Sequence, residues 1–493
     1  MSEAQFQNRK AAKIEGGFDA LVIGATADAF AAAALMARAG LHVVLIETGE
    51  RAQDKKEIAP GYYAIPGDPI AFALDQAVVD GLDLYRCGLS FAARRLETFV
   101  RFGDGATLTT TGDPELIEEA VAALCEADAG AFSAFLAQER KTARALTDWF
   151  SGGAAPAAPG REMLAASIDD VLSGRFADRR LTDYLRAEAS LGAPARASEP
   201  YSYLSLLRRL SGEIAGLQGG VAAIAGGGRG LANALRRAAQ TAGVSIRQTD
   251  RVKSVIVEWD KVAGVSFDDG GQLRAPIIVS ALGARETFID FVGRARLDIE
   301  FARILDFASP PIGSCRAHLA LSGPLGDPLV GADLSRRFLL ALAAQPLESG
   351  FLAARRGEVR PGVAELVFPS SLDAALAPHG CLTATILLHP VPYFSPDDEP
   401  RRAQIEQLAR DALRAIAPEM SAGVVAVDIE APVRAAPTTY EAIERRRLIT
   451  DASGLEGYYF CGPEALIGAG VSLSAGRRAA ERALRYFRTG GAS

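Results

Sequence analysis

One strand–helix–strand unit near the start of the chain constrains its fold more than any other segment. Residues 19–24 (DALVIG) form an apolar run that predicts a buried parallel strand, and residues 27–39 have the alanine-rich pattern of a helix. Gly40 can end that helix in a left-handed conformation, and residues 41–47 (LHVVLIE) predict a second strand. Such a unit is typical of an α/β domain with a doubly wound parallel sheet.

The turn between this first strand and its helix carries part of a dinucleotide-binding fingerprint. Gly24 supplies the tight turn, Ala29 is small enough for close helix packing, and Glu47 follows Gly24 by 23 positions (47 − 24). Thr26, however, stands where a glycine normally lets the backbone approach a diphosphate. Its hydroxyl can cap the helix, with Asp28 complementing the helix dipole, or it can donate to a phosphate oxygen. Both interpretations stay open.

The length and the pattern of the chain predict more than one domain, because 493 residues exceed one ordinary core. Residues 113–150 predict helices that start with an Asp cap and Pro114, whereas strands and a hairpin return after residue 221. We therefore expect a discontinuous Rossmann-like domain built from residues 17–110, 213–300 and 438–493. An α+β substrate domain is expected from residues 111–212 and 301–437.

Composition excludes several classes of function. The net charge of −7 disfavours non-specific binding to nucleic acid. The polar N-terminus lacks the apolar core of a signal peptide, and no run of 18 uncharged apolar residues appears in the sequence. We therefore expect a cytoplasmic protein with at most peripheral membrane contact. The five cysteines form no CxxC pair and the four histidines have no metal-ligand spacing, so neither a redox dithiol nor a metal site is expected.

Three separate blocks, taken in order, resemble the phytoene desaturase-like branch of FAD-dependent oxidoreductases, which is related to the amine oxidases. The first block is FDALVIGATADAFAAAALMARAGLHVVLIE, and the second runs from AGGGRGLANALRRAAQ to PIIVSAL. The third is GLEGYYFCGPEALIGAGVSLSAGRRAAERAL. The resemblance implies a FAD-binding Rossmann-like domain of the GR2 type and a substrate domain over the flavin. It also implies oxidation, desaturation or isomerisation of a bulky apolar substrate.

The resemblance assigns cofactor contacts to particular positions of this chain. They are Gly24, Ala25, Thr26, Ala29, Glu47, Val252, Gly462, Gly470, Val471 and Ser472. Three regions depart from the family pattern, and each of them has lost small residues. Thr26 replaces a glycine, no Gly-Gly pair follows Glu47, and larger residues stand in the last block, where Leu466 and Ile467 replace a His-Pro pair and Leu473 replaces a glycine.

Two hypotheses for function follow. The first is a FAD-dependent oxidoreductase that transfers a hydride from an apolar substrate to flavin. The second is a flavin-free relative that acts as a binding or scaffold subunit, as a homo-oligomer or beside an intact paralogue. No catalytic residue can be nominated, although Arg316, His318 and Tyr440 are polar candidates in the substrate region.

A separate NAD(P) site is a further alternative. The run Gly226–Gly230 could be a second phosphate loop, since Asp250 lies 24 positions (250 − 226) after its first glycine. Against this, Leu231 occupies the third glycine position and the preceding residues form a poor strand.

Overall fold

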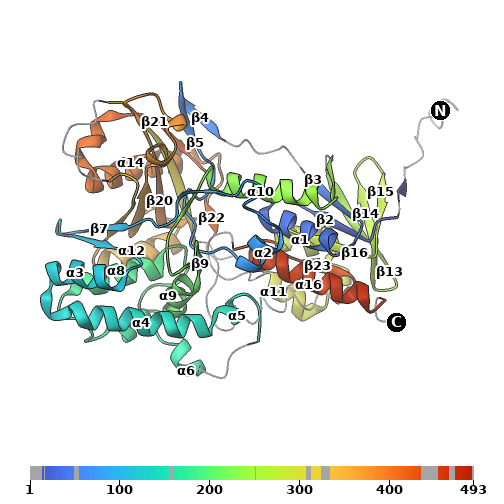
Figure 1. Cartoon of the computed structure of the whole chain (residues 1–493), viewed down its shortest axis with the longest axis horizontal. Helices are drawn as coiled ribbons and strands as arrows, with labels where there is room; N and C mark the ends of the chain where they lie inside the picture. Colours follow the sequence, from blue (N-terminus) through green and yellow to red (C-terminus); the bar gives the residue numbers. More distant parts are fainter. Residues whose placement is uncertain are drawn as a thin grey trace.

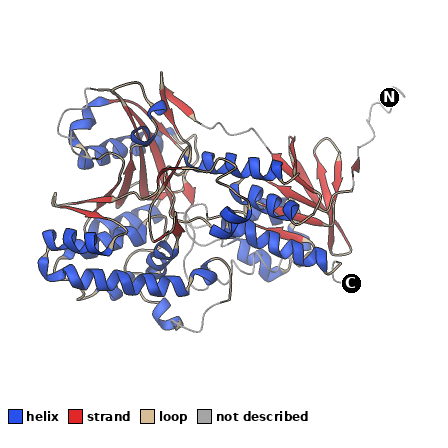
Figure 2. Cartoon of the chain, in the orientation of Figure 1, coloured by secondary structure: helices blue, strands red, loops and turns tan. Residues whose placement is uncertain are grey.

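The computed structural model describes residues 14–15, 17–48, 55–154, 160–249, 251–306, 312–323, 333–434, 454–465 and 472–490. The chain folds into two parts that lie side by side, each with its own sheet and helices (Figures 1 and 2). Segments from the start, middle and end of the sequence meet in one of them, which we call the nucleotide-type part. The other is the second part.

A five-stranded parallel sheet forms the centre of the nucleotide-type part. Its order is β12 (Ser245–Thr249), β3 (Val43–Thr48), β2 (Ala20–Ile23), β16 (Ile277–Ser280) and β23 (Tyr458–Phe460). All neighbouring strands run parallel. Every residue of β2 and β16 is buried, which explains why both strands are continuous apolar runs.

Helices cover one face of this sheet, and a second, small sheet lies on the other (Figure 1). The helices are α1 (Ala27–Arg38), α10 (Gly227–Thr241) and α16 (Ser474–Arg488). The small sheet contains β13 (Val252–Glu258), β14 (Lys261–Phe267), β15 (Gln272–Arg274) and β1 (Ile14–Glu15), and the π-helix η3 (Arg285–Asp290) and α11 (Ile299–Asp306) pack beside it. This arrangement confirms the Rossmann-like α/β architecture expected from the sequence.

The second part is built on a large mixed sheet of the described residues, ordered β21 (Val424–Ile429), β17 (Ile312–Leu321), β20 (Leu382–Pro392), β19 (Val363–Val367), β18 (Arg337–Ala341), β7 (Thr98–Phe102) and β8 (Thr107–Thr110). The short β22 (Val433–Arg434) also pairs with β17. One face packs against α3 (Pro114–Leu124), α4 (Ala129–Ala145), α8 (Arg179–Ser190), α9 (Ser202–Ser211) and α12 (Ala344–Arg355), and the other against α14 (Glu399–Ile416).

Short elements connect the two parts. They include β4 (Lys56–Ala59), β5 (Tyr62–Ala64), α2 (Gln76–Gly81), β6 (Phe91–Ala93), β9 (Glu213–Ile214), β10 (Leu217–Gln218) and β11 (Ala223–Ile224). Shorter helices of the second part are α5 (Thr147–Phe150), α6 (Arg161–Leu164), α7 (Ile168–Leu172) and α13 (Pro369–Leu372). Because β7 and β8 pair in the large sheet, the predicted limit at residue 110 does not follow the sheets. The domain limits themselves stay a prediction.

Helices α1 and α16 approach so closely that a glycine is needed at their crossing. A Cβ on Gly476 would lie 2.3 Å from the backbone oxygen of Asp28. The facing surfaces are alanines, among them Ala31, Ala32 and Ala479, all buried. Small side chains therefore bring the last helix of the chain against the first.

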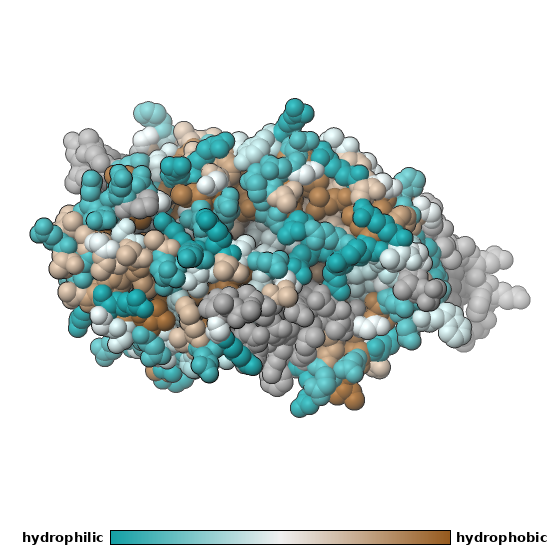
Figure 3. All heavy atoms as spheres, turned by 60° about the horizontal axis from the view of Figure 1, so that its bottom comes forward, coloured by the Kyte–Doolittle hydropathy of each residue, from teal (hydrophilic) through white to brown (hydrophobic). Residues whose placement is uncertain are grey.

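Surface residues on the side shown in Figure 3 are polar and apolar in alternating small groups. No helix in the described part of the chain is long and apolar enough to cross a membrane.

The crossing predicts opposite effects for two glycine-to-alanine substitutions in helices. Gly476→Ala should lower the free energy of unfolding by about 1–3 kcal/mol, because the new methyl group would overlap backbone that cannot move independently. Gly130→Ala in α4 meets nothing within 4 Å and should raise it by about 0.5–1 kcal/mol through helix propensity. Urea denaturation of both variants checks this. Equal effects of the two substitutions would contradict a tight crossing.

Candidate functional site

Gly24 forms the tight turn that the fingerprint requires. Its φ of +123° is unfavourable for other residues, and its N–H donates to the carbonyl of Ile46 at 2.9 Å. A Cβ at this position would lie 3.3 Å from the Cβ of Ala281 in the strand beside β2. The turn is thus fixed by backbone conformation and by the neighbouring strand together.

Thr26 is the N-cap of α1, as its sequence position predicts. Its Oγ1 accepts a hydrogen bond from the N–H of Ala29 at 3.2 Å, which satisfies one of the free donors of the first turn. Ala25 and Thr26 are both exposed. No described residue accepts from the N–H groups of Ala25, Thr26 or Ala27. The helix is therefore capped, but three donors at its N-terminus stay accessible.

Asp28 serves a different helix from the one expected. Its Oδ1 accepts from the N–H of Gly476 at 2.8 Å, at the N-terminal turn of α16. Burial against α16 raises the pKa of Asp28, the hydrogen bond from the N–H of Gly476 lowers it in part, and the negative charge of Asp75 raises it. Together these effects bring the pKa from 3.8 to about 6. The sequence indicated only a contact with the dipole of its own helix.

Glu47 is buried, and its partner is a side chain of the protein. Its carboxylate forms an ion pair with Arg236 of α10. The guanidinium of Arg236 also lies 5.1 Å from the centre of the Phe30 ring, so it is held between the two side chains. The acid predicted to bind ribose hydroxyls is thus already engaged. No local pattern indicates this pair, because Arg236 is 189 residues away along the chain.

Other predicted contact residues are explained by packing. Ala29 is completely buried, as expected for the helix-packing position. Val252 is 1% exposed at the start of β13, opposite Phe267 of β14. Gly462 follows β23, and a Cβ there would lie 1.9 Å from the carbonyl oxygen of Leu282. Gly470 and Val471 lie outside the described residues, as do Leu466 and Ile467.

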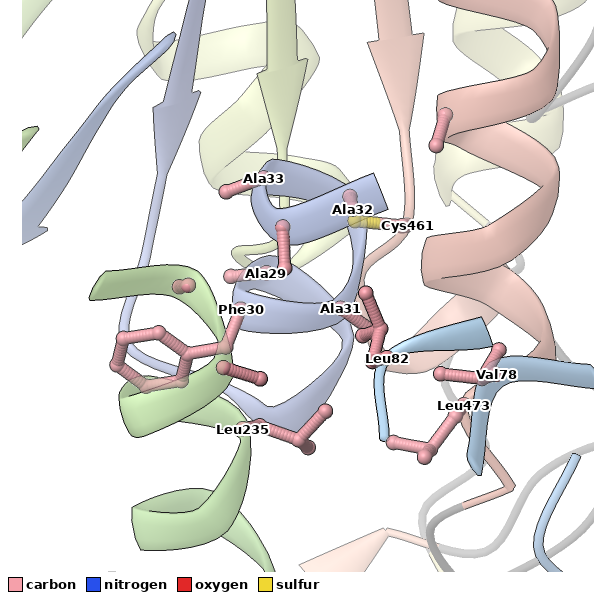
Figure 4. Close-up of a cluster of buried hydrophobic side chains, with 14 of the residues drawn as sticks. Ala29, Phe30, Ala31, Ala32, Ala33, Val78, Leu82, Leu235, Cys461 and Leu473 are labelled. Atoms are coloured by element: carbon pink, nitrogen blue, oxygen red, sulfur yellow. The ribbon is translucent and has the colours of Figure 1, made fainter. Parts of the chain in front are cut away.

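Leu473 adopts a backbone conformation that normally favours glycine. Its φ is +69°, in the left-handed region, and it is the N-cap of α16. Its side chain is completely buried and lies near Val78 and Leu82 (Figure 4). An apolar contact with α2 thus offsets a strain of order 1 kcal/mol for a leucine in this region.

Asp75, which sequence reasoning missed, holds the start of α16 against the segment before α2. Its N–H donates to the carbonyl of Ser472 at 2.8 Å. Its Oδ2 accepts from Arg477 Nε at 2.7 Å and from Ser474 Oγ at 3.2 Å. Ser472 is buried, and its Oγ accepts from the N–H of Ser474 at 3.4 Å. The end of the fold where a flavin would lie is therefore positioned by hydrogen bonds within the protein.

The glycine run at 226–230 has a packing role. A Cβ on Gly230 would lie 1.8 Å from the carbonyl oxygen of Ala225, and one on Gly227 would lie 2.9 Å from Ile65 Cγ2. The preceding β11 pairs antiparallel with β6 and is not part of the parallel sheet. A phosphate loop of the βαβ type needs a parallel strand at that point, so the NAD(P) alternative lacks its structural basis.

The polar candidates of the second part belong to an ion-pair network on β17. Arg316 pairs with Asp68 and, at 3.6 Å, with Glu430. His318 Nε2 lies 3.1 Å from a Glu430 oxygen. Burial raises the pKa of Glu430, but the hydrogen bond from His318 and the neighbouring positive charges outweigh it and bring that pKa to about 2. Tyr440 lies outside the described residues.

The cysteines of the described part are consistent with structural thiols. Burial raises the pKa of Cys315 to about 12, and it raises that of Cys461 well above its ordinary value. Within the described ranges, no cluster of three or more His, Cys, Asp or Glu side chains could hold a metal ion.

A cavity of about 250 Å³ lies in the second part, and we call it the interior cavity. It is lined by residues of β7, β8, α3, α4, α8 and α9 and of the segments 95–97, 111–113 and 217–221, and it is open to solvent on the side of the exposed residues. Leucines form much of its wall, and its polar lining includes Thr98, Thr110, Arg140, Tyr184, Glu188 and Arg209. The Arg209 guanidinium lies 4.0 Å from the centre of the Phe72 ring. Since Phe72 and Asp75 belong to one short segment, that segment joins the cavity to the start of α16.

Comparison with curated sequences gives relatives that match over most of both chains. A mouse protein named pyridine nucleotide-disulfide oxidoreductase domain-containing protein 2 is 24% identical over 548 residues, covering 96% of this chain and 94% of the mouse protein. The rat protein of the same name is also 24% identical, covering 95% of this chain and 93% of its own length. No protein-family profile matches the chain.

Solved structures share the fold over the whole described architecture. An oxidoreductase from Methanosarcina mazei has a TM-score of 0.64 at 16% identity, covering 95% of this chain and all of its own. Putrescine oxidase bound to putrescine has a TM-score of 0.64 at 15% identity, with 96% and 100% covered. Cyclohexylamine oxidase from Brevibacterium oxydans gives 0.57 at 16% identity, with 95% and 98% covered. The chain thus has the two-part α/β fold of amine oxidase-like oxidoreductases, while the narrower resemblance to phytoene desaturases stays a prediction.

The raised pKa of Asp28 predicts a pH-dependent stability. In the unfolded chain Asp28 ionises near 3.8, whereas in the folded protein it ionises near 6. The folded state therefore binds more protons between these values, and the stability from this group is lost as the pH rises through about 6. Asp28→Asn, which can still accept from Gly476, should raise the free energy of unfolding by about 2–3 kcal/mol at pH 7.5 and have little effect at pH 4.

Chemical denaturation of the wild type and the variant from pH 4 to pH 7.5 measures this difference. Asp80→Asn, at an exposed position of α2, serves as the control and should give a difference that is small throughout. An Asp28→Asn effect independent of pH would show that the carboxyl is not titrating in this range.

Proposed function

We propose that this protein is a FAD-dependent oxidoreductase that holds its cofactor with fewer contacts than its relatives. One observation carries the proposal. The N-terminus of α1 follows a glycine turn, is exposed, and has accessible N–H groups at Ala25, Thr26 and Ala27. Donors at a helix N-terminus favour a diphosphate, and the threonine methyl narrows the approach without closing it. The fold shared with oxidoreductases supports the same conclusion.

The residues present fit some parts of a FAD molecule better than others. The turn at Gly24 to Ala27 would hold the diphosphate, Val252 would contact adenine through its backbone, and Ser472 with the start of α16 would face the flavin. Glu47 could receive the ribose hydroxyls only after Arg236 turned away, because the two side chains are paired. The ribose end is therefore the weaker part of the site, and we expect reduced affinity.

When bound, FAD supplies an acceptor for a hydride from the substrate. The chain itself would bind and orient a bulky apolar substrate and keep water from it. We propose oxidation, desaturation or isomerisation as the reaction class, as in the phytoene desaturase-like enzymes that the sequence resembles. A cytoplasmic location, with at most peripheral membrane contact and with a homo-oligomer or a paralogous partner, belongs to the same proposal.

A second candidate function is a flavin-free binding or scaffold subunit. The pairing of Glu47 with Arg236 and the cap from Thr26 favour it, since both complete the fold without a ligand. The two candidates differ in one simple property. A purified flavoprotein absorbs near 450 nm, whereas the scaffold would be colourless and would not take up added FAD.

Replacement of the capping threonine tests the proposed site by gain of function. Thr26→Gly should increase FAD affinity about tenfold, equivalent to about 1.4 kcal/mol, because it opens the approach to the backbone and frees the Ala29 donor. It should lower stability by at most about 1 kcal/mol through loss of the cap. Quenching of flavin fluorescence on titration with protein measures the affinity.

The matched control is Asp113→Gly, which removes the N-cap of α3 in the second part. It should cause a similar loss of stability and leave FAD affinity unchanged. If neither the wild type nor Thr26→Gly bound FAD, the oxidoreductase proposal would be wrong and the flavin-free candidate would stand.

A further inference from the structure

We propose that the interior cavity of the second part binds a small amphipathic anion, a monocarboxylate with an apolar body. The site is separate from the nucleotide-type part, and anion binding there would not require FAD. It is built around Arg140, a positive charge that has no counter-charge among the described residues.

Arg140 of α4 is the unmatched charge. Its Nε is buried and has no hydrogen-bond partner, and no described residue accepts from its guanidinium or forms an ion pair with it. Burial lowers the pKa of Arg140, and no carboxylate nearby opposes that effect. The half-buried Arg140 therefore has one donor, its Nε, withdrawn from water without a partner, a cost in free energy that a bound acceptor would recover.

Except for Arg95, which is exposed, the other charged groups at the cavity have partners within the protein. Glu188 is shared by Arg337 and Arg209, and Arg337 also binds Glu365 at 2.6 Å. These two arginines and two glutamates balance in charge. Glu97 pairs with Arg336 at 2.9 Å, and Asp113 caps α3. Glu188 and Glu97 therefore have ion-pair partners of their own, whereas no described residue pairs with Arg140.

Arg209 adds a second feature of an anion site. Its Nη1 donates to the carbonyl oxygens of Gly219 and Gly220, at 3.2 and 3.4 Å, and its Nε lies 3.5 Å from Glu188 without a hydrogen bond. The side chain is thus held in place with one buried donor unsatisfied. Near Arg140 and Arg209, the Tyr184 hydroxyl lies 3.4 Å from Thr110 Oγ1 and provides a neutral polar group.

The remaining wall determines the kind of anion. Leu136, Leu206, Leu210 and Leu217 line the cavity, so an inorganic ion would leave most of the space in contact with apolar groups. A guanidinium matches the planar carboxylate with two parallel hydrogen bonds. At roughly 30 Å³ for each water molecule of the liquid, a cavity of about 250 Å³ has the volume of about eight waters, which is enough for a carboxylate with a chain of several carbon atoms. A short-chain or medium-chain carboxylate has these properties.

Calorimetric titration of the full chain with octanoate, octanol and octylamine tests the proposal at pH 7. Octanoate should bind at least tenfold more tightly than octanol, and octylamine should not bind, because Arg140 attracts only the anion. Arg140→Gln should weaken octanoate binding at least tenfold. Arg144→Gln changes an exposed arginine one turn further along the same helix and should leave the affinity unchanged.

A second variant distinguishes a binding residue from a structural one. Arg140→Met removes the unsatisfied donor and should raise the melting temperature of the ligand-free protein while it abolishes octanoate binding. Octanoate should raise the melting temperature of the wild type and not of this variant. Three results would each overturn the proposal. The first is that the folded wild type does not bind octanoate, and the second is that the Gln variants of Arg140 and Arg144 lose octanoate affinity equally. The third is that the protein binds sulfate alone. Since none of these measurements uses flavin, failure here leaves the proposed oxidoreductase function untouched.

Discussion

The nucleotide-type part of the protein depends on the close crossing of α1 and α16. These helices come from opposite ends of the chain, and their contact requires a residue without a side chain at Gly476. The Asp28 carboxylate then accepts from the N–H of that same glycine. Because the parallel sheet takes its strands from four separate stretches of sequence, this crossing closes a domain that no single stretch could form.

The same region shows how a nucleotide-type turn can be stabilised from within. Thr26 caps α1, Arg236 neutralises Glu47, and Leu473 fills the space beside α2 while its backbone adopts a glycine conformation (Figure 4). Each of these contacts replaces something that a bound cofactor could supply. All three contacts stabilise the folded chain without a ligand, so its stability depends less on a bound cofactor. The donors at Ala25 to Ala27 nevertheless remain accessible, and they are the reason for proposing a weakened flavin site and not a lost one.

In the second part, by contrast, some buried hydrogen-bond donors have no partner within the protein. A buried ion-pair network around Arg337 is balanced, yet Arg140 beside it has neither a counter-charge nor a partner for its Nε. Phe72 packs on Arg209 at the edge of this cavity, and Asp75 binds the start of α16 three residues later. A ligand in the cavity would therefore lie close, through one short segment, to the place where a flavin would be held.

The sequence by itself determined the class of fold and most of its elements. The apolar runs predicted β2 and β3, because strands buried on both faces must be apolar along their whole length, and the strands expected after residue 221 include β12, β13, β14 and β16. Caps and glycines predicted α1 at residues 27–39, where the helix runs from 27 to 38, and the start of α3 after Asp113. The last helix begins at Ser474, since Leu473 adopts a left-handed conformation that no pattern assigns to a leucine.

Tertiary structure alone decided what the candidate site residues contact. Glu47 meets Arg236, Asp28 meets Gly476, and Asp75 meets Arg477, across separations that local patterns do not encode. The unmatched Arg140 was equally beyond the sequence, since whether a charge has a partner depends on which helices pack around it. Periodicity and capping act within a few residues, so a sequence reveals them. Ion pairs, cavities and close crossings form between distant segments, and only the folded chain brings those segments together.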